Sequence, residues 1–401
     1  MAESLWSLTP CSSFGYAQLA QCWQELEGRS KPACFQSWAW IGTWLECLPD
    51  DVAPRVAVRR ENGVVTGLAM LCAARSRRHR ILPLSNWHLT EAGRPDCDTL
   101  TVEHNAPLLA HSSPGFAAGL IDCLIAAAAW DELVLPGLDD SSLEDVRGAA
   151  SARGLSVEEF DRKPWYWVDL DGLRGRGTEY LDALSNNTRY QIRRARRAYE
   201  KMGPLEISIA RSVGEAREFF ASLERLHQKY WVARGVPGAF ANPFFRKFHE
   251  RFIDTRFGAG NVELVRVTTG TQEVGYLYNL VLDGAVFAYQ SGFAYTDQAH
   301  LKPGLVTHAA CIEAHLRGGR RSYDFLAGRG QYKDSLSLES REMVWLRLQR
   351  PRLKLSLERR ARSIWRTLRE ALPVKAPAPS AVAVKARATD AEPRTEASRS
   401  E

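Results

Sequence analysis

Hydrophobic positions in the second half of the chain follow two periodicities, which predict a regular succession of elements. Apolar residues recur every three to four positions in three segments, which predicts helices at 214–234, 243–257 and 303–317. Short apolar runs predict strands at 206–210, 262–269, 274–282, 285–294, 323–326 and 343–348. Asp283-Gly284 between two of these runs is a strong hairpin signal. The predicted order is a strand, two helices, a three-stranded meander, a helix and a strand.

The first half repeats this order more weakly. The pattern predicts helices near 15–27, 36–48, 115–129 and 141–153, a hairpin with strands at 55–60 and 64–74, and a strand at 133–135. The shared order suggests a degenerate duplication, and the alternative is that α+β domains resemble one another at this level of detail. We expect an α+β fold with domains at 1–170 and 171–350, a basic amphipathic helix at 351–372 and a disordered tail at 373–401.

Composition excludes several classes of protein. With 45% hydrophobic and 25% charged residues, the 401-residue chain is neither wholly disordered nor a fibrous repeat. The longest apolar stretch, 120–130, includes Asp122 and is far shorter than a membrane span of about 20 residues. No signal peptide is visible, and eight scattered cysteines without a C-x-x-C pair fit a reducing cytoplasm. Neither the cysteines nor the nine histidines show metal-ligand spacing, so we predict no metal and a cytoplasmic location, with attachment to the inner membrane as an added alternative.

The net charge of +6 is concentrated in two basic segments, which predicts local anion sites. The first, 185–201, carries +5, and Arg189, Arg193 and Arg197 recur there every four residues as one helical stripe flanked by Arg194 and Arg196. Glu200 is the acid nearest in sequence, and the stripe is either an anion site or a solvated basic face.

The second basic segment, 347–370, carries +7 and overlaps the predicted amphipathic helix. This helix either docks on its own domain or lies on anionic lipid. Its apolar stripe consists of Leu353, Leu357, Ile364, Leu368 and Leu372, with Trp365 beside it.

Three short motifs, taken in order, resemble one family. They are the segment 184–197, which reads Leu-Ser-Asn-Asn-Thr-Arg-Tyr-Gln-Ile-Arg-Arg-Ala-Arg-Arg, the Lys302-Pro303-Gly304 start of a helix, and Tyr323-Asp-Phe-Leu-Ala-Gly328 followed by Tyr332-Lys333. The element order is similar to the GNAT acyltransferase fold. The motifs resemble the CelD-like acetyltransferase domain associated with cellulose biosynthesis, a branch similar to the Fem-type aminoacyl transferases of peptidoglycan synthesis.

The resemblance covers about residues 30–350 and is strongest over 180–336. It implies tandem GNAT-like domains, a degenerate one over 1–170 and an acyltransferase domain over 171–350, with acetyl-CoA or another acyl-CoA as donor. The usual cofactor signature, (Gln/Arg)-x-x-Gly-x-(Gly/Ala), is replaced by Gln298-Ala-His-Leu-Lys-Pro-Gly304.

The start of the predicted helix at 303–317 is a candidate donor site. Lys302, Pro303, Gly304 and Leu305 place a cation and unpaired backbone N–H groups at a helix N-terminus, which favours phosphate. In the resembled fold the CoA pyrophosphate lies here, and the alternative is an ordinary helix that begins with proline.

Candidate catalytic residues surround the predicted strand at 323–326. A glycine-rich turn at 328–330 can return Lys333 to Asp324, which is either a catalytic pair or a structural ion pair. In the first reading, Asp324 accepts a proton from the acceptor or orients Lys333, which holds an anionic group or polarises the acyl carbonyl. Tyr332 then protonates the departing thiolate.

The strand at 285–294 carries the remaining candidates. Alternation places Tyr289 and Ser291 on one face and Gln290 and Gly292 on the other. Gly292 suggests a bulge or a close approach to a ligand, and the alternative is an edge kink. In the resembled fold, backbone N–H groups of this strand bind the thioester carbonyl.

We expect Gln290 to line the acceptor site, and Tyr289, Trp231 and the arginine stripe to bind substrate. His227 and His308 are interpreted as packing or cleft residues.

The resemblance implies transfer of an acyl group from acyl-CoA to an amine or hydroxyl. We expect direct attack, since no pattern for a covalent nucleophile stands out in the sequence. The family implies small-molecule or glycan acceptors of the cell envelope, such as amino sugars, polysaccharides or lipid-linked precursors. One alternative is aminoacyl transfer from a charged tRNA whose phosphates the arginine stripe binds. Another is a non-catalytic scaffold of a polysaccharide synthesis complex. The pattern makes no prediction of oligomeric state.

Overall fold

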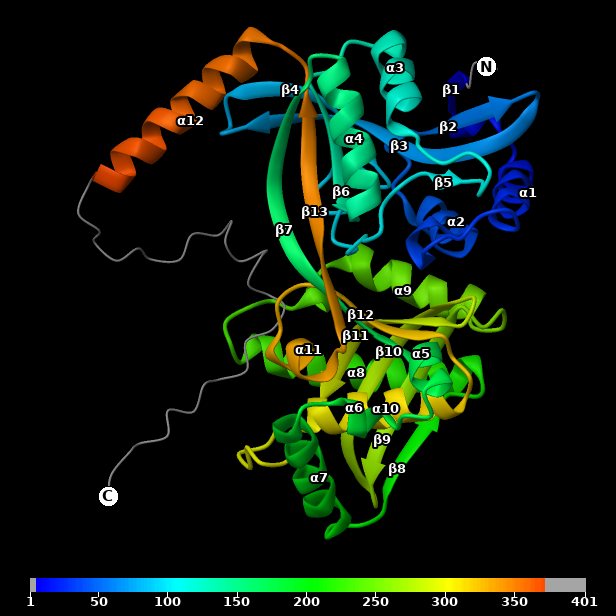
Figure 1. Ribbon diagram of the computed structural model, residues 1–401, viewed down its shortest axis with the longest axis vertical. Coiled ribbons are helices and arrows are strands. Elements are labelled where there is room, and N and C mark those ends of the chain that lie inside the picture. The colour runs from blue at the N-terminus through cyan, green and yellow to red at the C-terminus, as the bar shows by residue number, and fades with distance from the viewer. Residues whose placement is uncertain (1–4, 372–401) are drawn as a thin grey trace. The chain divides into compact units, whose positions relative to one another are not determined.

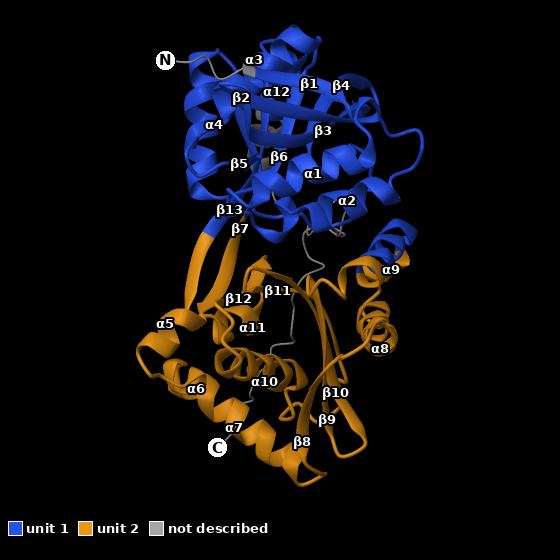
Figure 2. Cartoon of the chain, turned by 90° about the vertical axis from the view of Figure 1, so that its right-hand side faces the viewer, with its two compact units in different colours: residues 1–162, 242–252, 342–377 blue, residues 163–241, 253–341, 378–401 orange. Residues whose placement is uncertain are grey.

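The computed structural model describes residues 5–371, which divide into two compact units (Figure 2). Unit 1 contains the described residues up to Arg162, Asn242–Phe252, and those from Glu342 onward. Unit 2 contains Lys163–Ala241 and Ile253–Arg341. The predicted tail at 373–401 lies outside the described residues. The predicted domains are continuous in sequence, whereas each unit is assembled from separate segments.

Unit 1 is built on a sheet with the strand order β1-β2-β3-β4-β6-β13, in which only β4 and β6 pair in parallel (Figure 1). Its strands are β1 (Leu5–Pro10), β2 (Pro54–Glu61), β3 (Val64–Arg78), β4 (Leu82–Leu89), β5 (Leu108–Leu109), β6 (Glu132–Leu138) and β13 (Glu339–Gln349). Its helices are α1 (Tyr16–Glu27), α2 (Trp38–Cys47), α3 (Ala117–Ala127), α4 (Asp140–Ala152) and α12 (Leu353–Ala371). Leu120, Trp130 and Leu346 belong to the apolar cluster that packs α3 and α4 against the sheet.

Unit 2 has the strand order β7-β12-β11-β10-β9-β8, in which only β11 and β12 pair in parallel. Its strands are β7 (Ser156–Asp169), β8 (Leu205–Ile209), β9 (Val262–Thr269), β10 (Gln272–Leu282), β11 (Ala285–Phe293) and β12 (Ser322–Ala327). Its helices are α5 (Leu170–Gly175), α6 (Tyr180–Ala183), α7 (Asn186–Glu200), α8 (Val213–Val232), α10 (Pro303–Arg317) and α11 (Gln331–Leu336). β7, β13 and α9 (Pro243–Arg256) contribute residues to both units.

The expected fold class is confirmed, since mixed sheets are flanked by helices. The hairpin predicted at Asp283-Gly284 is also confirmed, because both residues adopt positive φ, 46° and 78°, as such a turn requires. The predicted inner face of α7 is buried as well. Ile192 packs with Leu305 and Ile312, while Ala195 and Tyr199 share a cluster with the start of α10.

The helix predicted at 351–372 is present as α12, but its apolar stripe faces solvent. Leu353, Leu357 and Ile364 are 85%, 63% and 61% exposed. Leu355 on another face of the helix is fully buried. Polar bonds from Lys354 to Asp131 and from Arg362 to Glu158 also hold the helix on unit 1. The side chains of Trp365, Leu368 and Leu372 lie outside the described part. Within residues 5–371, we find no helix with both the length and the apolar character of a membrane span.

Candidate active site

Strands β11 and β12 are paired over only three residues of each, and their pairing ends at Phe287 and Asp324. β11 continues to Phe293 and contains a bulge, because Gln290 pairs with Tyr278 whereas Ala288 pairs with Asn279, which leaves Tyr289 as the additional residue. The parallel pairing therefore stops where the predicted acid, Asp324, lies.

Asp324 is a buried carboxylate with two firm hydrogen bonds. The Trp165 indole N–H donates to Oδ2 at 2.8 Å, and the Leu326 amide donates to Oδ1 at 2.6 Å. β12 bulges between Asp324 and Leu326, and Leu326 has φ 62°, which is uncommon for a residue with a side chain. Such strained backbone persists only where its surroundings hold it, and it is frequent at functional sites.

Lys333 returns to the end of β12, as the glycine-rich turn predicted. Its side chain is buried, and Nζ donates to the carbonyl oxygens of Ala327 at 3.0 Å and Leu326 at 3.4 Å. Leu326 therefore contacts both members of the predicted pair, one through its amide and the other through its carbonyl.

Tyr332 stacks on His308, with ring centroids 5.1 Å apart and an interplanar angle of 15°. His308 is buried in α10, and burial, reinforced by the Lys333 charge, lowers its pKa to about 3. Nδ1 lies 2.9 Å from the Tyr323 hydroxyl, and Nε2 has no hydrogen-bond partner among the described residues. His308 is therefore neutral at pH 7 and joins the cluster around Asp324. The sequence interpretation of His308 as a packing or cleft residue of this helix agrees with its burial.

The start of α10 has the features expected of an anion site. Lys302 precedes the helix in a left-handed conformation with φ 46°, and its side chain makes no capping bond. Pro303 has no N–H, so Gly304 and Leu305 supply the first free donors of this turn. A Cβ at Gly304 would lie 3.3 Å from the Phe293 ring, so the turn packs closely on the end of β11.

The close approach expected at Gly292 is to the backbone of helix α8 and not to a ligand. A Cβ at this position would overlap the backbone oxygen of Leu223 in α8. The sequence interpretation is corrected here: the bulge lies at Tyr289, and Gly292 permits helix–sheet contact.

The predicted substrate residues lie along β11 and α8. Gln290 Oε1 accepts from the Ser291 amide at 3.1 Å, and the Tyr289 ring meets Tyr278 edge-on at 6.0 Å. The Trp231 ring lies 6.0 Å from that of His227, whose Nδ1 is 3.2 Å from the Ser291 carbonyl oxygen. Burial lowers the pKa of His227 to about 4, so it is a neutral link between α8 and β11.

The positive charge of the arginines on α7 is partly neutralised by acidic residues other than Glu200, the acid nearest in sequence. Asp182 lies 3.0 Å from Arg189 and 3.5 Å from Arg193. Arg196 binds Glu313 of α10 through both guanidinium nitrogens, at 3.1 and 2.7 Å. Arg194 and Arg197 are exposed and have no ion pair within the described part of the chain.

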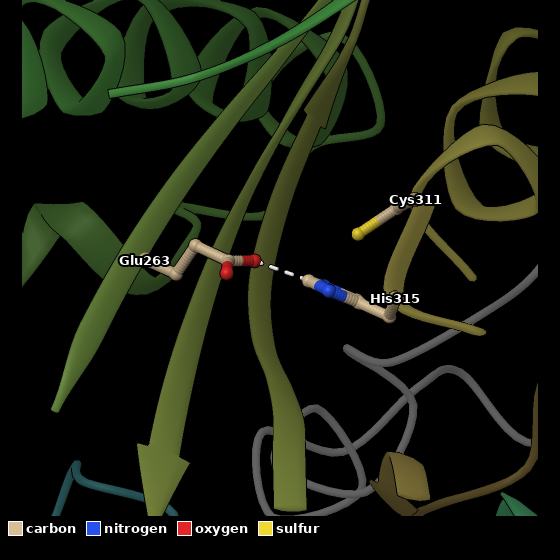
Figure 3. A group of neighbouring side chains, drawn as sticks. All are labelled: Glu263, Cys311 and His315. Atoms are coloured by element: carbon tan, nitrogen blue, oxygen red, sulfur yellow. Dashed lines mark ion pairs between the residues drawn. The ribbon is translucent and has the colours of Figure 1, made fainter. Parts of the chain in front are cut away.

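Two further features of unit 2 lie away from these residues. A groove of about 560 Å³ follows the edge strand β8, between Ile207 and Arg211, and none of the predicted site residues lines it. A buried group on β9 and α10 brings together Glu263, Cys311 and His315 (Figure 3). Burial opposes protonation of His315, but its polar neighbours Cys311 and Glu263 raise its pKa to about 10.

Comparison with known proteins identifies the domain that carries this cluster. Residues 186–334 match the family described as an acetyltransferase (GNAT) domain. No curated protein matches the chain. The match confirms the predicted enzyme class, an acyltransferase of GNAT type, and such a domain implies an acyl-CoA donor in general.

Solved structures share the fold at low identity. The crystal structure of FemX is 11% identical, with 82% of this chain and 96% of that chain covered and a TM-score of 0.51. A conserved protein of unknown function from Bacteroides thetaiotaomicron VPI-5482 is 10% identical, with coverage of 84% and 98% and a TM-score of 0.53. The C-terminal domain of a protein described as a lysylphosphatidylglycerol synthetase from Agrobacterium fabrum is 10% identical, with coverage of 86% and 96% and a TM-score of 0.50. These likenesses concern the fold.

Proposed function

We propose that the protein transfers an acyl group from acyl-CoA directly to an amine or hydroxyl of a cell-envelope or exopolysaccharide-related acceptor. The observation that carries this proposal is the position of the cluster. Asp324, Lys333, Tyr332 and His308 all lie within the matched acetyltransferase segment, at the point where β11 and β12 cease to pair.

The residues at the start of α10 fit the CoA part of the donor. Lys302 contributes a positive charge, and Gly304 and Leu305 contribute backbone donors at the positive end of a 15-residue helix. These groups would hold the pyrophosphate. Backbone groups of β11 near the Tyr289 bulge would bind the thioester carbonyl.

The buried side chains supply the proton movements of direct transfer. The acceptor nitrogen or oxygen forms a bond to the acyl carbon, the bond from that carbon to sulfur breaks, and the acceptor loses a proton. Asp324 accepts this proton or orients Lys333, and Lys333 polarises the acyl carbonyl or holds an anionic group of the acceptor. Tyr332 donates a proton to the departing thiolate. Gln290, Tyr289, Trp231 and the arginines of α7 bind the acceptor.

The acceptor class rests on the motifs, which resemble the CelD-like branch, with acetyl-CoA as the first donor to test. Aminoacyl transfer from tRNA is the second candidate, favoured by Arg194 and Arg197, which are exposed and form no ion pair with the described residues. The fold shared with FemX and with a domain described as a lysylphosphatidylglycerol synthetase is compatible with either.

A single assay separates these functions. The purified protein is incubated with acetyl-CoA and a panel of amino sugars, glycans and lipid-linked precursors, while thiol release and product mass are followed. Parallel reactions replace acetyl-CoA with charged tRNA. Acceptor-dependent release of CoA with a product heavier by one acetyl group is the expected result. Product only with charged tRNA would support the second candidate, and no product with either donor would support a scaffold.

The exposed stripe of α12 supports a peripheral contact of a cytoplasmic enzyme with anionic membrane. Leu353, Leu357 and Ile364 provide the apolar contact, within a segment that carries excess positive charge. Sedimentation with vesicles of phosphatidylglycerol and phosphatidylcholine tests this: Leu357→Glu should abolish binding to the anionic vesicles. Equal binding of parent and variant would remove α12 from the contact.

A further inference from the structure

We propose that unit 2 contains a buried site for a zinc-type divalent cation, formed by Glu263, Cys311, His315 and Asn279. This inference is independent of the acyl acceptor and goes beyond the transferase reaction. The ligand atoms of the first three residues all lie within 4.8 Å of one another, and the side chains point toward one another from β9 and α10 (Figure 3).

The backbone holds all four side chains in place. Cys311 and His315 are four residues apart on α10, so they lie on one helix face. Glu263 and Asn279 are direct cross-strand partners on β9 and β10. Two adjacent strands and the helix that covers them therefore each contribute to the group. A tetrahedral zinc site has ligand distances of about 2.0–2.3 Å, which places its ligand atoms roughly 3.3–3.7 Å apart. His315 Nε2 and Glu263 Oε1, now 2.9 Å apart, would move apart slightly to admit the ion.

The contact between His315 and Glu263 differs from an ordinary hydrogen bond. Nε2 lies 2.9 Å from Oε1, yet it has no hydrogen-bond partner of acceptable geometry among the residues that the structure describes. Because no N–H is directed from one atom to the other, a cation placed between them would give both atoms a partner once they had moved slightly apart.

Asn279 gives a second, independent indication. Its side chain is fully buried, and its Nδ2 lies 3.1 Å from Glu263 Oε1 and 3.7 Å from Cys311 Sγ. Its Oδ1 has no hydrogen-bond partner within residues 5–371. The oxygen and nitrogen of an asparagine amide are assigned from their hydrogen bonds. Rotation of the amide by 180° would turn the orphaned Oδ1 toward the group, where a cation would satisfy it as a fourth ligand.

The chemistry of the ligands favours zinc over magnesium or calcium, which take oxygen ligands alone. A thiolate and a carboxylate would neutralise the two charges of the ion, with neutral imidazole and amide completing the site. The competing description is a buried ion pair of Glu263 with His315 and with Arg320, whose Nη2 lies 3.5 Å from Oε2. In that description Cys311 is a polar neighbour of His315 and binds no ion.

Metal loading of the full chain decides between the two descriptions. The protein is unfolded, refolded with Zn²⁺ or Co²⁺, freed of excess metal and analysed for metal content. The expected result is one ion per chain, a thiolate-to-Co²⁺ charge-transfer band, and a melting temperature raised by roughly 5 °C or more with Zn²⁺. Less than about a tenth of an equivalent bound and no such band would overturn the proposal.

Variants locate the ion. Cys311→Ser should lose the charge-transfer band, and Cys311→Ala should lose at least tenfold in Zn²⁺ affinity. Cys72→Ala, at another buried cysteine, should keep both properties. A band that survives Cys311→Ser and disappears in Cys72→Ala would also overturn the assignment. Because the readouts are metal content and spectra, a missing acyltransferase activity would not affect them.

Discussion

Asp324 and Lys333 are connected through the backbone of Leu326. The amide of Leu326 donates to Asp324 Oδ1, and its carbonyl oxygen accepts from Lys333 Nζ. This peptide segment is held in a left-handed conformation between two buried, oppositely charged side chains. A change at either side chain is therefore transmitted to the position of the other.

Replacement of Asp324 tests whether the cluster is catalytic. Asp324→Asn keeps the volume and most hydrogen bonds but removes the base, so turnover should fall by about 10²-fold or more, with little change in melting temperature. Asp334→Asn, at an exposed position on α11, is the matched control and should leave both unchanged. If the carboxylate is only structural, loss of the buried charge should cost about 3–5 kcal/mol of unfolding free energy. Normal turnover per folded molecule would then contradict a catalytic role for Asp324.

Lys302→Glu should weaken CoA binding by about tenfold, because the substituted charge opposes phosphate at the start of α10. The fold should be unaffected, since the Lys302 side chain makes no capping bond. Isothermal calorimetry measures the affinity, with Lys31→Glu, an exposed lysine of unit 1, as the control. Equal loss in both variants would indicate a general charge effect, and no loss in either would remove Lys302 from the site.

The arginines of α7 should separate into two classes. Arg196→Ala should lower the unfolding free energy by about 1–2 kcal/mol, because it breaks a half-buried bidentate bond to Glu313. Arg197→Ala should change stability by less than about 0.5 kcal/mol but reduce affinity for the anionic substrate, with a flatter salt dependence. Denaturant unfolding and binding at several salt concentrations test both. Unchanged affinity and slope in Arg197→Ala would leave this arginine as solvated surface.

Acid should destabilise unit 2 through His308. Its pKa in the folded state, about 3, lies below the unfolded value of about 6.5, so the unfolded chain takes up the proton first. Stability is full above about pH 6.5 and is lost as the pH falls toward 3, by about 2 kcal/mol at pH 5. Denaturation at pH 7, 6 and 5 should show a shallower pH dependence for His308→Gln than for the exposed control His300→Gln. The same slope in both variants would show that His308 does not remain neutral on folding.

The sequence predicted elements well where apolar periodicity was uninterrupted. β9 and α10 begin and end at the predicted residues, and Lys333 returns to β12 as the glycine-rich turn suggested. β7 was missed, because Glu158, Glu159, Asp161, Arg162, Lys163 and Pro164 interrupt its alternation and favour a loop.

The site could be predicted only where its contacts are local in sequence. Trp165 lies on β7, the strand that the sequence did not predict, 159 residues before its hydrogen-bond partner Asp324. Hydrophobic periodicity gives no information on contacts between residues so far apart in the chain. The sequence analysis found no metal-ligand spacing and did not single out Cys311 and His315, which Glu263 and Asn279 join only through strand register. For Gly292, the sequence indicated a close approach, and only the structure identifies Leu223 as the neighbour.

In the sheet of unit 1, a strand from late in the chain, β13, pairs with the earlier strand β6, and this has a consequence for synthesis on the ribosome. β6 is hydrogen-bonded to β4 on one side and to β13 on the other, and the pairing with β13 uses residues 344–349. A nascent chain that ends anywhere before Val344 leaves one edge of β6 unpaired, although every residue of β6 is buried in the finished fold. Most of unit 1 is therefore translated before unit 2, but the sheet of unit 1 is completed only after β13 has been synthesised. During translation, the open edge of β6 is therefore a place where the unfinished chain can pair with another chain.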